Sequence, residues 1–147
     1  MPASKKVLTL EEDYGFLDKV YIIGVQAPEL PLHRLAYFLN ENAQWDLTCT
    51  DDYLDAYSLL QCRLSLERLN IFLLENKNPE PLIKCENCDY FLIACGEVEH
   101  YDFEALTELV RNIEWVFDVY KVEVDVKTNR HAPLTEFLMM RGRFPGE

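Results

Sequence analysis

The sequence of 147 residues has few of the features by which enzymes and membrane proteins are recognised. Its five glycines are not spaced as in a phosphate-binding loop, and it has neither a G-x-S-x-G nor an H-E-x-x-H motif. No apolar run approaches the ~20 residues of a membrane-spanning helix. Basic residues are also scarce, with 14 against 26 acidic ones and a formal net charge of −12. These absences remove the common routes to catalysis and disfavour binding to nucleic acid or to an anionic membrane.

The cysteines and the first residues indicate a compartment. The five cysteines are an odd number, and the N-terminal residues contain no apolar run of signal-peptide length. We therefore expect a cytoplasmic protein without a disulfide framework. Its acidic surface favours basic partners or simply keeps the protein in solution.

The chain shows no internal repeat and no Gly/Ser-rich linker. Its apolar content, 49% on a broad count, is enough for a core without disulfides or metal. We expect a flexible or edge N-terminal segment at residues 1–15 and a single α+β domain at 16–127. Residues 128–147 are expected to form a C-terminal tail with a short helix.

Apolar periodicity predicts the secondary structure within the domain. Amphipathic helices are expected after Pro31 and after Asp102, and strand patterns occupy 20–25, 54–76, 89–95 and 116–126. The order favours an α+β fold, with a mainly antiparallel sheet of five to seven strands and two amphipathic helices on one face. The opposite face must then be polar or covered by a partner.

One family resembles this pattern. The run Asp89-Tyr90-Phe91-Leu92-Ile93, followed by an acidic loop, an amphipathic helix and the strand from Val116 to Val124, is similar to the bacterial IPExxxVDY family. The resemblance extends over about residues 16–138. Proteins of that family are short, cytoplasmic and typical of Bacteroidota, with no assigned activity. The resemblance therefore implies a small fold and transfers no catalytic residue.

Cys85 and Cys88 form a C-x-x-C pattern, the most conspicuous local motif of the chain. Zinc sites use this spacing because two thiolates on a tight turn can share one tetrahedral ion. Redox proteins place such a pair at a helix N-terminus, where the dipole lowers the pKa of the thiol. This chain has no second C-x-x-C pair, and its motif precedes a strand. We favour thiols that pack in the core, with a metal site and a redox site as alternatives, and we expect no cofactor.

A ligand-binding or catalytic loop is the second candidate site. It contains four titratable residues between a predicted strand and a predicted helix: Glu97, Glu99, His100 and Asp102. Carboxylates beside a histidine can act as general acid and base, with Tyr57 or Arg63 as further contributors. No nucleophile is identifiable nearby, so we favour a solvated loop in which Asp102 caps the helix.

The C-terminal tail is mildly basic in an acidic chain, and it carries a group of apolar residues: Phe137, Leu138, Met139 and Met140. Methionine and aromatic side chains are enriched at the centres of interfaces. This group could contact a second copy of the chain or another protein. A tail that folds onto the chain's own core, or that is frayed, is the alternative.

The sequence therefore favours a non-catalytic binding or self-association module, with a homodimer or another protein as the expected partner. Two alternatives stay open. One is a small-ligand-binding protein or an enzyme that uses the loop 97–102, and the other is a metal-binding protein that uses Cys85 and Cys88. The favoured function depends on one argument: two helices leave part of the sheet bare, and bare apolar area needs a partner.

Overall fold

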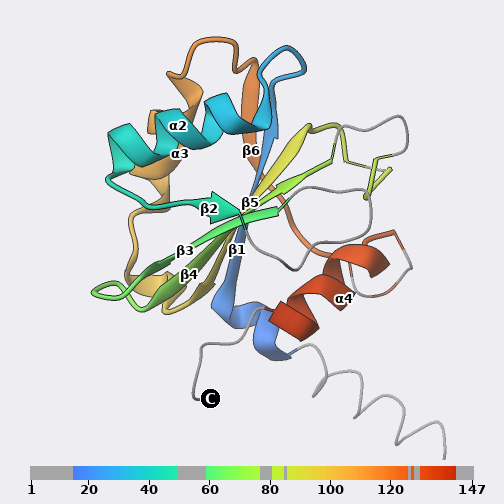
Figure 1. Cartoon of the computed structure of the whole chain (residues 1–147). Coiled ribbons are helices and arrows are strands. Elements are labelled where there is room, and N and C mark those ends of the chain that lie inside the picture. Colours follow the sequence, from blue (N-terminus) through green and yellow to red (C-terminus); the bar gives the residue numbers. More distant parts are fainter. Residues whose placement is uncertain are drawn as a thin grey trace, which may run out of the picture.

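The computed structural model describes residues 15–49, 59–76, 81–84, 86–125, 127 and 130–141. The prediction of an α+β fold with five to seven antiparallel strands is confirmed, because the described residues form one six-stranded antiparallel sheet with helices (Figure 1). The elements follow one another as η1 (Gly15–Lys19), β1 (Val20–Gln26), α2 (Leu32–Ala43), β2 (Thr48–Cys49), β3 (Leu59–Leu64), β4 (Leu69–Glu75), β5 (Tyr90–Gly96), η2 (Val98–His100), α3 (Phe103–Arg111), β6 (Asp118–Lys121) and α4 (Ala132–Arg141).

The strands lie in the order β2-β3-β4-β5-β1-β6. β4 and β5 form the centre and pair in register from Leu69 opposite Gly96 to Glu75 opposite Tyr90. Both are nearly continuous apolar runs, and every residue of β5 is buried. Such runs are typical of strands covered on both faces, whereas a strand with one wet face alternates polar and apolar residues.

One face of the sheet packs against α2 and α3, and we call this half of the protein the α2/α3 layer. Leu35 and Leu39 of α2 and Leu106 and Val110 of α3 belong to one buried apolar cluster with side chains of the central strands. From the strands come Ile23, Val25, Leu69, Ile71, Leu73, Leu92 and Ala94. The hydroxyl of Tyr90 adds a polar link, because it donates a hydrogen bond to the carbonyl of Leu30 just before α2.

The opposite face is covered by α4 and by residues 81–84 and 86–88 between β4 and β5, and we call this half the α4 layer (Figure 1). Its buried cluster joins three side chains of α4 to the remaining face of the strands: Leu134, Phe137 and Leu138. The expectation of a polar or partner-covered second face is therefore corrected. The spacing of these residues, i, i+3 and i+4, makes one apolar stripe that the chain's own sheet buries.

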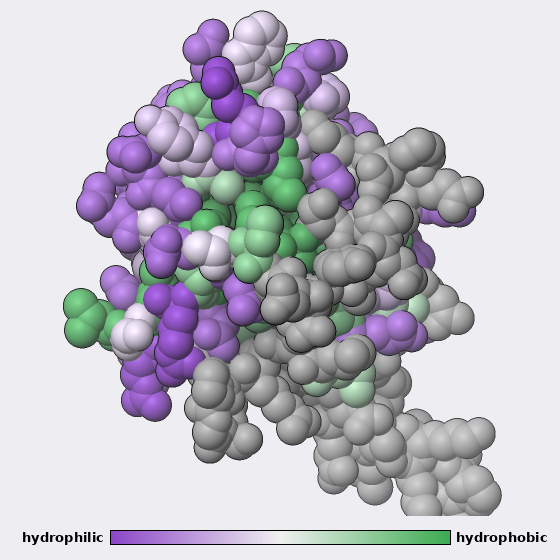
Figure 2. Space-filling view, in the orientation of Figure 1, coloured by the Kyte–Doolittle hydropathy of each residue, from purple (hydrophilic) through white to green (hydrophobic). Residues whose placement is uncertain are grey.

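The outer surface over α2 and over the β3–β4 hairpin is mainly hydrophilic, with apolar side chains visible between them (Figure 2). No helix in the described part of the chain is long and apolar enough to cross a bilayer.

Candidate functional site

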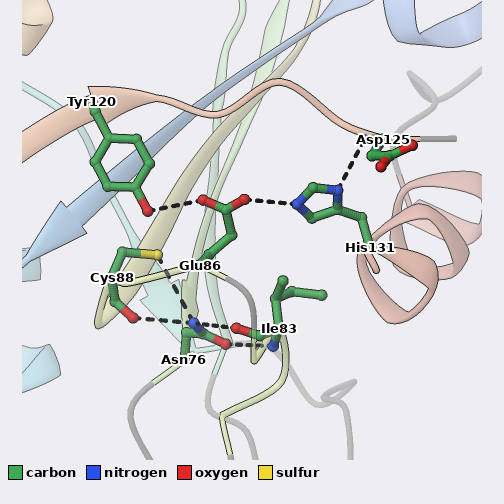
Figure 3. A network of polar contacts seen from close by, with 7 residues as sticks. All are labelled: Asn76, Ile83, Glu86, Cys88, Tyr120, Asp125 and His131. Atoms are coloured by element: carbon green, nitrogen blue, oxygen red, sulfur yellow. Dashed lines mark hydrogen bonds and ion pairs between the residues drawn. The ribbon is translucent and has the colours of Figure 1, made fainter. Parts of the chain in front are cut away.

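The most connected group of polar side chains lies within the α4 layer (Figure 3). It brings together Glu86 from the β4–β5 connection, Tyr120 from β6 and His131, which immediately precedes α4. Gly24 makes room for it, because Gly24 lies opposite Tyr120 in the β1–β6 pair and a Cβ atom there would stand 2.8 Å from the Tyr120 ring. The fold thus brings Tyr120 and His131, from two separate parts of the chain, to the carboxylate of Glu86.

Both oxygens of the Glu86 carboxylate accept hydrogen bonds. The Tyr120 hydroxyl donates to Oε1 at 3.0 Å, and Nε2 of His131 lies 2.8 Å from Oε2. The other ring nitrogen of His131, Nδ1, accepts a hydrogen bond from the backbone N–H of Asp125 at 2.9 Å. Because Nδ1 faces a donor, the proton of the neutral ring belongs on Nε2, which then donates to Glu86. The His131 side chain is only 3% exposed and that of Glu86 is 16% exposed.

Asn76 holds the same connection from its other side. Its amide Nδ2 donates to the carbonyls of Ile83 and Cys88, at 3.3 and 3.1 Å, and its Oδ1 accepts from the Ile83 N–H at 2.8 Å. Asn76 is 1% exposed, so these bonds satisfy backbone groups that water does not reach. No buried side-chain nitrogen or oxygen in the described residues lacks a hydrogen-bond partner.

Burial sets the ionisation of this group. It raises the pKa of the Cys88 thiol to about 12, with the negative charge of Glu86 adding to the shift. It also raises the pKa of Tyr120, whose hydroxyl lies beside both Cys88 and Glu86. Cys88 is therefore a neutral thiol at neutral pH, and nucleophilic attack or metal binding requires a thiolate.

A carboxylate between a tyrosine and a histidine resembles a general acid–base site. Here, however, both nitrogens of His131 and both oxygens of Glu86 are already bonded within the protein. No ring nitrogen is left to exchange a proton with a substrate. The arrangement acts as a polar clamp that fastens the start of α4 and the β4–β5 connection to β6.

Only one cysteine of the C-x-x-C motif lies in the described part of the chain. Cys85 lies outside the described residues, and Cys88 is buried beside Asn76. No group of three or more His, Cys, Asp or Glu side chains among the described residues could hold an ion. Burial also raises the pKa of Cys95 to about 12, which is consistent with a thiol that packs in the core.

The acidic loop spreads its side chains over the surface. Oε1 of Glu97 lies 3.6 Å from Nη1 of Arg68. Oε1 of Glu99 lies 3.6 Å from Nε2 of His100, whose side chain is 75% exposed. Asp102 accepts a hydrogen bond from the Ala105 N–H at 3.0 Å and so caps α3. Of the two further candidates, Arg63 is exposed on β3 and Tyr57 lies outside the described residues.

A pocket of about 380 Å³ opens between the start of β1 and the residues after β6, and Val98 is the member of this loop that lines it. The four titratable residues of the predicted site are not among its lining. The lysine that lines it, Lys121, already has partners. Its Nζ lies 3.3 Å from Oε1 of Glu123 and 4.8 Å from the centre of the Tyr21 ring. The pocket therefore offers no unpaired cation to a ligand.

The predicted interface residues are divided by the structure. Phe137 and Leu138 are 2% and 1% exposed inside the α4 layer, so they are not available to a partner. Met139 is 43% exposed, and the side chain of Met140 lies outside the described part. The helical stripe was correctly recognised as apolar, but its contact is the chain's own sheet.

A different surface carries large apolar side chains. Trp115 and Phe117, between α3 and β6, are 54% and 64% exposed. They belong to residues 112–118, which we call the aromatic loop. Val116 lies in a predicted strand, and its two aromatic neighbours were not among the predicted interface residues. The sequence contained a signal for this exposed surface, because two aromatic residues flank a valine shortly after the end of a helix.

The aromatic loop contains a tight turn. The Val116 N–H donates to the Ile113 carbonyl at 3.1 Å, and Trp115, the third residue of this turn, has φ 79°. Glycine or asparagine is usual where a turn requires a positive φ, because a side chain is strained there. Trp115 makes no hydrogen bond, ring stacking or cation contact with any other residue in the described ranges.

Comparison with known proteins finds no matching family model, no similar curated protein and no similar solved structure. The resemblance to the IPExxxVDY family stays a prediction. What the fold and its sites define is an α+β protein with two closed apolar layers, a buried polar clamp and an exposed aromatic loop.

Proposed function

We propose that the protein is a non-catalytic binding module that contacts a partner protein through the aromatic loop. The observation that carries this proposal is Trp115, a large apolar residue that is both exposed and held at a positive φ. A backbone conformation of this kind costs about 1–3 kcal/mol. Because the indole is 54% exposed, about half of the apolar area that it could bury is left for a partner.

The polar clamp supports a non-catalytic role. Its carboxylate and its imidazole are the groups most suited to proton transfer; both ring nitrogens of His131 are bonded within the protein, and each oxygen of Glu86 accepts one bond there. The surface of the acidic loop supports the same interpretation, because its side chains pair with neighbours or cap a helix.

Another protein is a better partner than a second copy of the chain at this surface. Every copy carries a formal net charge of −12 and presents Glu114 and Asp118 beside the aromatic pair, so two such loops repel one another. The homodimer predicted from the sequence was expected to form through the C-terminal tail or a bare sheet face, and two residues of that tail, Phe137 and Leu138, are buried. Light scattering of the purified chain tests self-association directly, and we expect a monomer.

The experiment for the binding role is affinity capture with matched variants. Trp115→Gly removes the indole and keeps a residue that accepts a positive φ, so the fold is retained. Leu66→Ala removes an apolar side chain that is 96% exposed on the β3–β4 turn, far along the chain from the aromatic loop. We expect one set of proteins to be captured by the native chain and by Leu66→Ala but lost with Trp115→Gly. Equal capture by Trp115→Gly and the native chain would contradict the proposal.

A further inference from the structure

We infer that the aromatic loop binds a segment of the partner that carries arginine side chains. This inference rests on the proposed function and adds the chemistry of the partner. It depends on how rigidly the loop is held, on the charges around Trp115 and Phe117, and on the state of the neighbouring strand edge.

The loop is fixed at both ends. At its start, Ile113 is 7% exposed and its N–H donates to the carbonyl of Val110 at the end of α3. At its far end, the N–H of Phe117 donates to the carbonyl of Gln26 at the end of β1, at 2.8 Å. Between them, Val116 packs against the cluster of the α2/α3 layer. The two aromatic rings are thus presented by a pre-formed backbone, which reduces the entropy lost on binding.

The charged residues of the aromatic loop are both negative. Glu114 and Asp118 are exposed and are the charged residues of the loop. The nearest cation along the chain, Arg111, is already engaged, because its guanidinium group pairs with Glu108 and donates to the carbonyl of Val119. Aromatic faces attract cations, and neighbouring carboxylates strengthen that attraction. A positively charged group is therefore the complementary ligand.

The edge of β6 is closed to an added strand at Val119. The N–H of Val119 donates a hydrogen bond to Oδ1 of Asp118 at 2.9 Å. The carbonyl of Val119 accepts a hydrogen bond from the guanidinium group of Arg111 at 3.2 Å. A partner that paired with this edge would have to displace both side chains. Beside Val119 we therefore expect recognition through side chains, and the exposed side chains of the aromatic loop include two aromatic and two acidic ones.

Arginine fits these groups better than lysine. Its planar guanidinium group can lie flat on an indole ring and still donate two parallel hydrogen bonds to a carboxylate at the ring's edge. The ammonium group of lysine is compact and strongly hydrated, so it gains less from the same site. Trp115 and Glu114 are consecutive residues of the turn, and both are exposed.

The test is a titration of the native chain with short peptides that alternate arginine with glycine and serine. The readout is the pair of indole N–H signals in a nitrogen–proton correlation spectrum, since the chain has two tryptophans and Trp45 is only 7% exposed. We expect the Trp115 signal to shift on addition of the arginine peptide while the Trp45 signal stays. The matching lysine peptide should bind about two- to five-fold more weakly, in line with the strength of cation–π contacts at exposed sites.

Variants separate this site from general attraction to an acidic protein. Trp115→Gly should lower the affinity for the arginine peptide about five-fold, Trp115→Phe should retain most of it, and Glu114→Gln should weaken it. Leu66→Ala should bind as the native chain does. Equal affinity of Trp115→Gly and the native chain would overturn the inference, and so would equal binding of a peptide with glutamate in place of arginine.

The two proposals fail in different ways. If Trp115→Gly loses partners in the affinity capture but the arginine peptide leaves the Trp115 signal unchanged, the binding role stands and the arginine chemistry is wrong. If Trp115→Gly captures the same proteins as the native chain, the binding role itself is wrong.

Discussion

The α2/α3 layer and the α4 layer cover the two faces of one sheet by different means. The first is closed by two helices whose buried side chains are apolar. The second is closed by one helix and an irregular connection, and it contains the three buried polar residues found among the described ones: Asn76, His131 and Thr135. The difference follows from the backbone. A helix satisfies its own peptide groups, whereas a buried connection needs side chains to do so.

This difference predicts how each layer breaks. An apolar cluster loses stability in proportion to the volume removed, and it tolerates exchanges of similar size. A buried polar network depends on each of its members, because removing one leaves its partners without hydrogen bonds. The α4 layer combines both kinds of interaction, so substitutions there distinguish them.

The largest effect is expected from Phe137→Ala. Phe137 is 2% exposed and packs edge to face on Phe72, with ring centres 5.4 Å apart. Its truncation should lower the free energy of unfolding by about 4 kcal/mol. Met139→Ala is the control, because Met139 is 43% exposed two residues further along α4 and should change stability little. Chemical denaturation of monomeric protein measures both. A small effect of Phe137→Ala would mean that α4 does not belong to the core.

Asn76→Leu should have the next largest effect. Leucine is close in size but leaves the Ile83 N–H and the carbonyls of Ile83 and Cys88 without the amide that now bonds them. The expected loss is about 3 kcal/mol, since each buried unpaired group costs about 1–3 kcal/mol. Asn76→Asp separates the two halves of the amide, because a carboxylate accepts from Ile83 but donates to neither carbonyl. Native stability of Asn76→Leu in denaturant would show that water reaches these groups.

Glu86→Gln should be milder, at about 1 kcal/mol. The amide can present its oxygen to His131 and its NH₂ group to the Tyr120 hydroxyl, so the contacts survive and only the charge is lost. Glu86→Leu removes the acceptor from both neighbours and should cost about 2 kcal/mol. Thermal unfolding of the two variants checks this order. Equal stability of Glu86→Gln and Glu86→Leu would show that the hydrogen bonds of the polar clamp do not stabilise the fold.

The smallest effect at neutral pH concerns the thiols of the α4 layer. Burial raises the pKa of Cys88 and Cys95 from 9.0 to about 12, whereas an unfolded thiol titrates near 9.0. Below pH 9.0 both states keep the protons, and the stabilisation is complete. Between pH 9.0 and about 12 the unfolded state loses protons that the folded state retains, so stability must fall as the pH rises.

Denaturant unfolding just below pH 9.0 and well above it measures this slope, and a double Cys88→Ala, Cys95→Ala variant is the control. The slope should be smaller in the control. An identical slope in both proteins would assign the alkaline sensitivity to other groups.

Much of the fold was predictable from local pattern. The residues of β5 form a continuous apolar run, and the apolar faces of α2 and α3 repeat with helical spacing. Asp102 stands before an apolar periodic run, and it caps α3 as predicted. These features depend on neighbours in the chain, so a single sequence carries them.

The second layer was harder to predict because its information is shared between distant residues. The stripe of Leu134, Phe137 and Leu138 is the same whether it faces its own sheet or a partner, so helical spacing alone could not decide. The continuous runs of β4 and β5 were the better signal, since strands with one wet face alternate polar and apolar residues.

No local pattern in the sequence predicted the polar clamp. Glu86 and His131 are 45 positions apart, and glutamate is a residue type usually found at the surface. Tyr120 lies within the strand predicted at 116–126, but no neighbouring residue in the sequence indicates the carboxylate to which its hydroxyl donates. Trp115 was missed for another reason, because the apolar alternation around Val116 predicted a strand where the chain makes a turn.

Native-state hydrogen exchange on the monomeric protein tests the central claim, that the chain itself closes both faces of its sheet. The amides in the last two turns of α4 should open with a free energy close to that of α2, because both helices rest on the same central strands. Fast exchange of those α4 amides in the monomer, with protection that appears only at higher protein concentration, would contradict the claim and return α4 to the role of an interface.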